Sequence, residues 1–72
     1  MKVKDLLKVL DEHQTVCITD ASMYEDVMHS DFGTCSELEV YSSRLQFDVA
    51  KVYVSPFHNN TITISHNNVI TL

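Results

Sequence analysis

The stretch VAKVYVSPFHNNTITIS, residues 49–65, constrains the fold of this chain more than any other part. Its second half alternates strictly, so Ile62 and Ile64 share one face of an extended strand and threonines occupy the other. Val52 and Val54 alternate in the same way before a Ser-Pro pair. Two such runs on either side of a polar segment predict an antiparallel hairpin.

The loop of this hairpin follows from the requirement that its valines and isoleucines lie together. A two-residue turn would put them on opposite faces, whereas a three-residue loop, His58–Asn60, pairs Val54 with Ile64 and puts them on one face. Such a loop asks for a left-handed residue at its end, and Asn60 tolerates that conformation better than most residues. The His-Asn-Asn triplet recurs at residues 66–68 and predicts the next turn.

The first residues predict an amphipathic helix from Met1 to about Glu12. Apolar side chains recur there at the spacing i, i+3, i+4 and i+7, and lysines turn toward water. The apolar stripe consists of Val3, Leu6, Leu7 and Leu10. The β-branched run TVCIT, Thr15–Thr19, then predicts the first strand.

Two structures compete for Asp20–Phe32. Ser22 and Glu25 form a capping box that would start a short helix. Residues 27–33, VMHSDFG, would instead form a second strand that pairs back onto the first and is closed by Gly33. The strand is the favoured interpretation.

A second capping box, Ser36 with Glu39, predicts one or two helical turns before Arg44. The side chains expected to anchor these turns are Leu38, Tyr41 and Leu45. All elements together predict one α+β domain, residues 1–72, in which a small antiparallel sheet of about four strands carries the N-terminal helix on one face. The expected core is Val16, Ile18, Val52, Val54, Ile62 and Ile64.

Neither an export signal nor a membrane span is recognisable in the sequence. No apolar run approaches the roughly 18 residues that cross a bilayer, and the first ten residues alternate charged with aliphatic side chains. A cytoplasmic location is therefore expected, and in that compartment Cys17 and Cys35 are expected to be reduced. Cys17 lies in an apolar run and should be buried, while Cys35 follows the only glycine and should be more exposed.

Sequence patterns of catalytic and metal sites are absent. The chain has no GxSxG, HExxH, P-loop or GxGxxG motif. His58 and His66 would lie some 25 Å apart at about 3.3 Å per residue of extended chain, too far to share an ion. We therefore expect no enzyme activity, no catalytic residue, no cofactor and no metal ligand.

Charge is the strongest clue to function. The formal net charge is −5, and the window from Val9 to Ser43 holds eight acids with no Lys or Arg. Such a region repels nucleic-acid phosphates, so direct DNA or RNA binding is disfavoured, whereas an acidic face attracts a basic protein. A face that only keeps the chain soluble is the alternative. The candidate partner-binding residues are Asp20, Glu25, Asp26, Asp31, Glu37 and Glu39.

The order of the segments MKVKDLLKVL, VCITD, DFGTCSEL and FDVAKVYVSPFHNNTITIS resembles small proteins encoded by prophages and mobile elements of Gram-positive bacteria. The resemblance covers most of the chain, but its motifs are generic and supply no catalytic or binding residues. It implies an accessory role in a mobile element, most simply binding to a host or phage protein.

Three other functions stay open. The chain could be the structural subunit of a small homo-oligomer, because its sheet has edges that must be covered or paired, and the segment VITL, residues 69–72, could pair two copies into a symmetric dimer. It could be an inhibitor that mimics nucleic acid, or an enzyme of unrecognised type. Tyr53 and Phe57 are the next contact candidates if the acidic face is only solvated.

Overall fold

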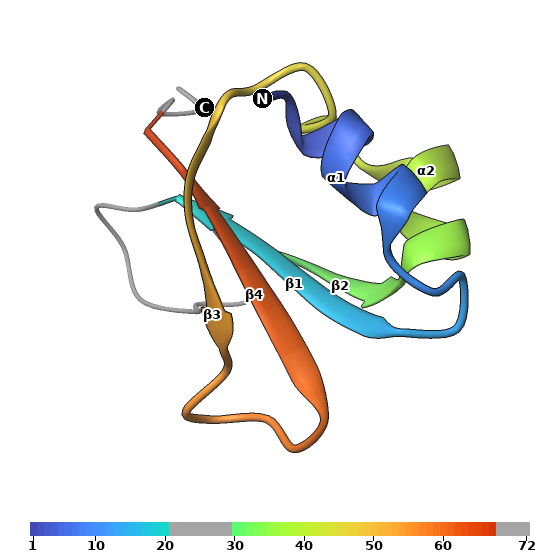
Figure 1. The fold of residues 1–72 in the computed structure, drawn as a ribbon, viewed down its shortest axis with the longest axis vertical. Coiled ribbons are helices and arrows are strands. Elements are labelled where there is room, and N and C mark those ends of the chain that lie inside the picture. Colours follow the sequence, from blue (N-terminus) through green and yellow to red (C-terminus); the bar gives the residue numbers. More distant parts are fainter. Residues whose placement is uncertain (21–29, 68–72) are drawn as a thin grey trace.

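The computed structural model describes residues 1–20 and 30–67. Within them two helices and four strands follow one another along the chain (Figure 1). The elements are α1 (Val3–Val9), β1 (Thr15–Asp20), β2 (Ser30–Thr34), α2 (Cys35–Tyr41), β3 (Val49–Val54) and β4 (Thr61–His66). The α+β class and the four strands are confirmed.

The four strands form one sheet in the order β2-β1-β4-β3. The outer pairs, β1 with β2 and β3 with β4, are antiparallel, but the central strands β1 and β4 are parallel. An entirely antiparallel sheet was expected, and that part of the prediction is wrong. Each hairpin is local, whereas the β1–β4 pairing depends on how the two hairpins dock side by side, which no local pattern records.

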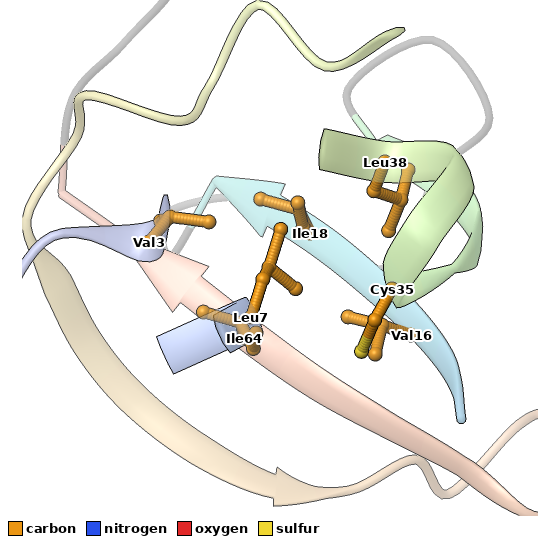
Figure 2. Packing of buried hydrophobic residues seen from close by; sticks show 7 residues of the cluster. All are labelled: Val3, Leu7, Val16, Ile18, Cys35, Leu38 and Ile64. Carbon is orange, nitrogen blue, oxygen red and sulfur yellow. The ribbon is translucent and has the colours of Figure 1, made fainter. Parts of the chain in front are cut away.

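Both helices lie on one face of this sheet, as Figure 1 shows. Leu7 of α1 and Leu38 of α2 pack there against Ile18 and Ile64 of the central strands (Figure 2). Cys35 is only 1% exposed and belongs to the same cluster, so its predicted exposure was wrong. Its position as the first residue of α2 turns its side chain toward the sheet, and both cysteines are buried and form no disulfide.

Helix α1 carries the predicted apolar stripe but is shorter than expected. Val3 and Leu7 are buried, and Leu6 and Leu10 are partly buried against the same core. The helix cannot begin at Met1 because the chain is extended there: Val49 N donates to Met1 O at 2.8 Å. Val3 N likewise donates to Phe47 O at 2.9 Å, so the first residues lie beside the start of β3.

The second strand exists, and its described part, Ser30–Thr34, extends one residue past the expected end at Gly33. Strand β2 pairs with Thr15–Thr19 of β1, so the sequence SDFGT is extended and Gly33 lies within the strand rather than closing it. The first half of the favoured VMHSDFG strand and the alternative helix from Ser22 fall in residues 21–29, outside the described residues.

Helix α2 begins two residues before the position that the sequence suggested. Its capping box is Thr34 with Glu37, not Ser36 with Glu39: Glu37 N donates to Thr34 Oγ1 at 3.3 Å, and Thr34 N donates to Glu37 Oε1 at 3.1 Å. Leu38 is buried as predicted. Tyr41, expected as an anchor, is 78% exposed because at 3.6 residues per turn it lies about a quarter turn from the buried side.

The β3–β4 hairpin has the predicted faces but a different register. Val54 pairs with Ile62 rather than Ile64, and Ser55 N donates to Thr61 O at 2.8 Å, which leaves a five-residue loop, residues 56–60. The longer loop shifts the register by two residues and so preserves the face of every side chain. Asn60 is left-handed, with φ of 56°, as predicted.

The prediction of a second turn at residues 66–68 is wrong for its first member. His66 is the last residue of β4 and is fully buried, with its ring centroid 4.8 Å from that of Phe47. The following residues 68–72, which include VITL, are outside the described part of the chain.

The expected core was right for three residues of the central strands, only partly right for Ile62, which is half-buried and outside the core cluster, and wrong for β3. Val16, Ile18 and Ile64 are completely buried. Val52 is 49% and Val54 is 75% exposed, although they share a face with Ile64, because nothing in the described core cluster packs over them.

Candidate functional site

Asp31, one of the predicted partner-binding acids, is engaged inside the molecule. Arg44 Nη1 lies 2.7 Å from Asp31 Oδ1, and Ser42 Oγ donates to Asp31 Oδ2 at 2.7 Å. Ser42 Oγ also accepts from Arg44 N at 3.0 Å, which closes a small network. The Arg44 side chain is only 9% exposed, so this ion pair is structural. Sequence reasoning missed it because Arg44 stands one residue beyond the window without bases.

Asp20 is also withdrawn from the surface. It ends β1 with 4% of its area exposed and is the parallel partner of His66. The alternation of β1 places its side chain on the same face as Ile18, beneath the helices. An acid buried there cannot contact a partner.

Glu37 and Glu39 are exposed on α2, as a partner-binding role requires. The hydrogen bonds that Glu37 accepts from the backbone and side chain of Thr34 hold the pKa of its carboxyl below the ordinary value of 4.5, so it stays ionised at neutral pH. The remaining candidates, Glu25 and Asp26, fall outside the described residues.

The loop before β1 adds two further acids to this part of the surface. Ser36 N donates to Glu12 O at 3.2 Å and Cys35 N donates to Gln14 O at 3.0 Å, so the loop is bonded to the start of α2. Burial, followed by the charges of Glu39 and Asp11, raises the pKa of the Cys35 thiol. We call Asp11, Glu12, Glu37 and Glu39 the α2 acidic patch.

Large apolar side chains are exposed next to these acids. Val40 and Tyr41, which directly follow Glu39 on α2, are each 78% exposed. Exposed aromatic residues near the centre of a contact surface often carry much of the binding energy. The sequence interpretation treated Tyr41 as a core anchor and so overlooked it.

A second surface feature lies beside the start of β1. A hollow of about 290 Å³ is lined by Gln14, Val54, Asn60, Thr61 and Ile62. Gln14 Nε2 donates to Asn60 O at 2.8 Å and to Thr15 O at 2.9 Å, which fixes one wall. The hollow adjoins β3, an edge strand of the sheet.

Metal-binding geometry is not found in residues 1–20 and 30–67: no three His, Cys, Asp or Glu side chains there come together as a group that could hold an ion. Nor does any helix in those two segments have the length and apolar character needed to span a membrane. Comparison of the chain with models of protein families, with curated proteins and with solved structures found no match.

Proposed function

We propose that this chain is a non-enzymatic protein-binding module whose α2 acidic patch contacts a basic surface on another protein. The observation that carries the proposal is the combination on one short helix of exposed acids, Glu37 and Glu39, with exposed Val40 and Tyr41. In keeping with the resemblance to prophage proteins, the proposed role is that of a cytoplasmic accessory protein of a phage or mobile element.

The two kinds of side chain would contribute differently to binding. The acids accelerate association by attracting a basic partner, an effect that salt screens over about 8 to 10 Å. Val40 and Tyr41 supply apolar area that leaves water on contact and slows dissociation. Asp20 and Asp31 are not part of the proposed contact surface, because Asp20 is buried and Asp31 is paired with Arg44.

The proposal is tested by cross-linking the chain to its partner in host lysate and then measuring the purified pair by surface plasmon resonance. Replacing Asp11, Glu12 and Glu39 by their amides should slow association several-fold and weaken its salt dependence. Tyr41→Ala should instead raise the dissociation rate. Asp48→Asn is the matched charge control, because Asp48 is an exposed acid at the start of β3 whose pairing with Lys2 is a surface contact of little energy.

Rates that respond to neither salt nor these substitutions would contradict the proposal and leave the patch a merely solvated face. Adding duplex DNA as competitor separates the remaining alternative. A partner that DNA displaces from the acidic patch would favour an inhibitor that mimics nucleic acid over a module that binds a protein site.

A further inference from the structure

Strand β3 has main-chain groups that no described residue satisfies. The bond from Ser55 N to Thr61 O shows that the peptide groups of Ser55 face β4. Because residues of an antiparallel strand alternate in this respect, the N–H and C=O groups of Val54 and Val52 point the opposite way, off the sheet. They lie on the free edge, since β3 ends the strand order.

The same edge already accepts an antiparallel segment a few residues earlier. The first residues of the chain pair there, with Lys2 bridging Asp48 and Val49 N donating to Met1 O at 2.8 Å. The outward main-chain groups of Val52 and Val54 lie farther along the same edge, beyond the register shift between Val49 and Lys51. Only an extended backbone matches such a row, because only a strand repeats its own groups at that spacing.

The side chains along this stretch suit a strand with apolar residues at alternate positions. Val52 and Val54 are 49% and 75% exposed on the face that carries the helices. A residue added opposite Val54 would place its side chain on that same face, beside the 290 Å³ hollow that Val54 lines. An added strand would therefore combine main-chain hydrogen bonds with a socket for one side chain.

Charge indicates which kind of chain supplies the strand. Gln14, which forms one wall of the hollow, follows Asp11 and Glu12 in the same tight loop, where Gln14 N donates to Asp11 O at 3.0 Å. A second copy of this chain also carries a net charge of −5 and would be repelled, whereas a basic segment would be attracted.

We infer that the free edge of β3 binds an extended segment of another protein, one with alternating apolar residues and a positive charge, whose central side chain enters the hollow beside Val54. The inference goes beyond the proposed function because it concerns the edge of β3, and it shares with the α2 acidic patch only the acids Asp11 and Glu12 of the loop before β1.

The experiment selects binders from a library of random displayed peptides and maps them by amide hydrogen exchange followed by NMR. In the free protein the Val52 and Val54 amides should exchange fast, while the Tyr53 amide, which faces β4, should exchange slowly. The selected peptides should share alternating apolar positions with Lys or Arg between them, and they should protect Val52 and Val54 at least tenfold.

Val54→Pro provides the decisive variant. It removes the outward N–H without removing a β3–β4 hydrogen bond, a position where edge strands accept proline, and should weaken peptide binding at least tenfold. If the β4 amides of this variant lose their protection from exchange, the hairpin is disturbed and Val54→Lys is used instead. This substitution keeps the N–H of residue 54 and repels a basic segment. Val9→Lys is the matched control: it changes an equally exposed valine at the end of α1, outside both proposed surfaces, and should leave peptide affinity unchanged.

Failure to obtain convergent peptides, protection at α2 instead of β3, or unchanged affinity of the Val54 variants would overturn the inference. A concentration-dependent dimer in sedimentation that Val54→Pro abolishes would overturn the choice of occupant and assign the edge to a second copy. The Val54 variants leave the acids of the patch and Tyr41 unchanged, so the inference and the proposed function can fail separately.

Discussion

The centre and the β3 edge of the sheet present similar aliphatic side chains to the same face, yet they differ completely in burial. Ile64 is fully buried, while Val52, its direct neighbour across the β3–β4 pairing, is 49% exposed. Alternation decides the face of a side chain, but cover by other elements decides whether it leaves water. Helices α1 and α2 have seven residues each, about 10 Å of helix, which suffices for β2 and the central strands but not for β3.

Replacing a side chain in each region should reveal this difference most strongly. Ile64→Ala should lower the free energy of unfolding by about 2–5 kcal/mol, because it opens a cavity beneath the helices. Val54→Ala should lower it by less than about 0.5 kcal/mol, because Val54 is already largely in water. Urea denaturation followed by circular dichroism measures both. Similar losses at the two positions would mean that β3 is covered in solution.

On the β2 side of the sheet, the ion pair between Asp31 and Arg44 can be removed by substitution. Arg44→Met should lower the free energy of unfolding by about 1–3 kcal/mol, because it leaves Asp31 without its charge partner in a half-buried position. The double variant Arg44→Met with Asp31→Leu should recover part of that loss, since two apolar groups need no partner. A double-mutant cycle that shows no coupling would rule out the ion pair in solution.

Substitutions at the N-cap of α2 test how much this cap stabilises the helix that covers the core. Thr34→Ala should lower the free energy of unfolding by about 1 kcal/mol, because it removes the side-chain acceptor for Glu37 N. Ser36→Ala, at the cap that the sequence suggested, is the control and should have a much smaller effect. The opposite order of the two losses would place the start of the helix at Ser36.

Lowering the pH should also weaken this cap, by less than Thr34→Ala does. The lowered pKa of Glu37 means that its bonds to Thr34 stabilise the fold at pH values above its ordinary pKa of 4.5 and are lost as pH falls through the folded value. Glu37→Gln should therefore differ in stability from the original chain near pH 7 and approach it near pH 3. A difference that is constant over this range would show that Glu37 carries no ionised bond.

Local patterns predicted the elements well where the signal was contained in a few neighbouring residues. The stripe of α1, the strand at Thr15, the shared face of Ile62 and Ile64 and the left-handed Asn60 all follow from such patterns. The hairpin register was missed because loops of three and of five residues both place the valines of β3 and the isoleucines of β4 on one face.

What the sequence could not supply was contact between distant segments. The parallel β1–β4 pair, the exposure of Val52 and Val54, and the partnership of Asp31 with Arg44 each depend on which parts of the chain meet. The candidate site was affected most. Of the six predicted acids only Glu37 and Glu39 are described and exposed, and the additions Asp11 and Tyr41 came from the docking of α2.

The parallel central pair also sets the order in which this molecule can fold. Its strands meet at a great sequence distance, since Gln14 and Asn60, joined by a hydrogen bond at their entrance, stand 46 residues apart. Hairpins form within microseconds, but a contact of this span must first close a long loop, and chains dominated by such contacts fold slowly. We therefore expect both hairpins to form early and their docking through β1 and β4 to set the folding rate.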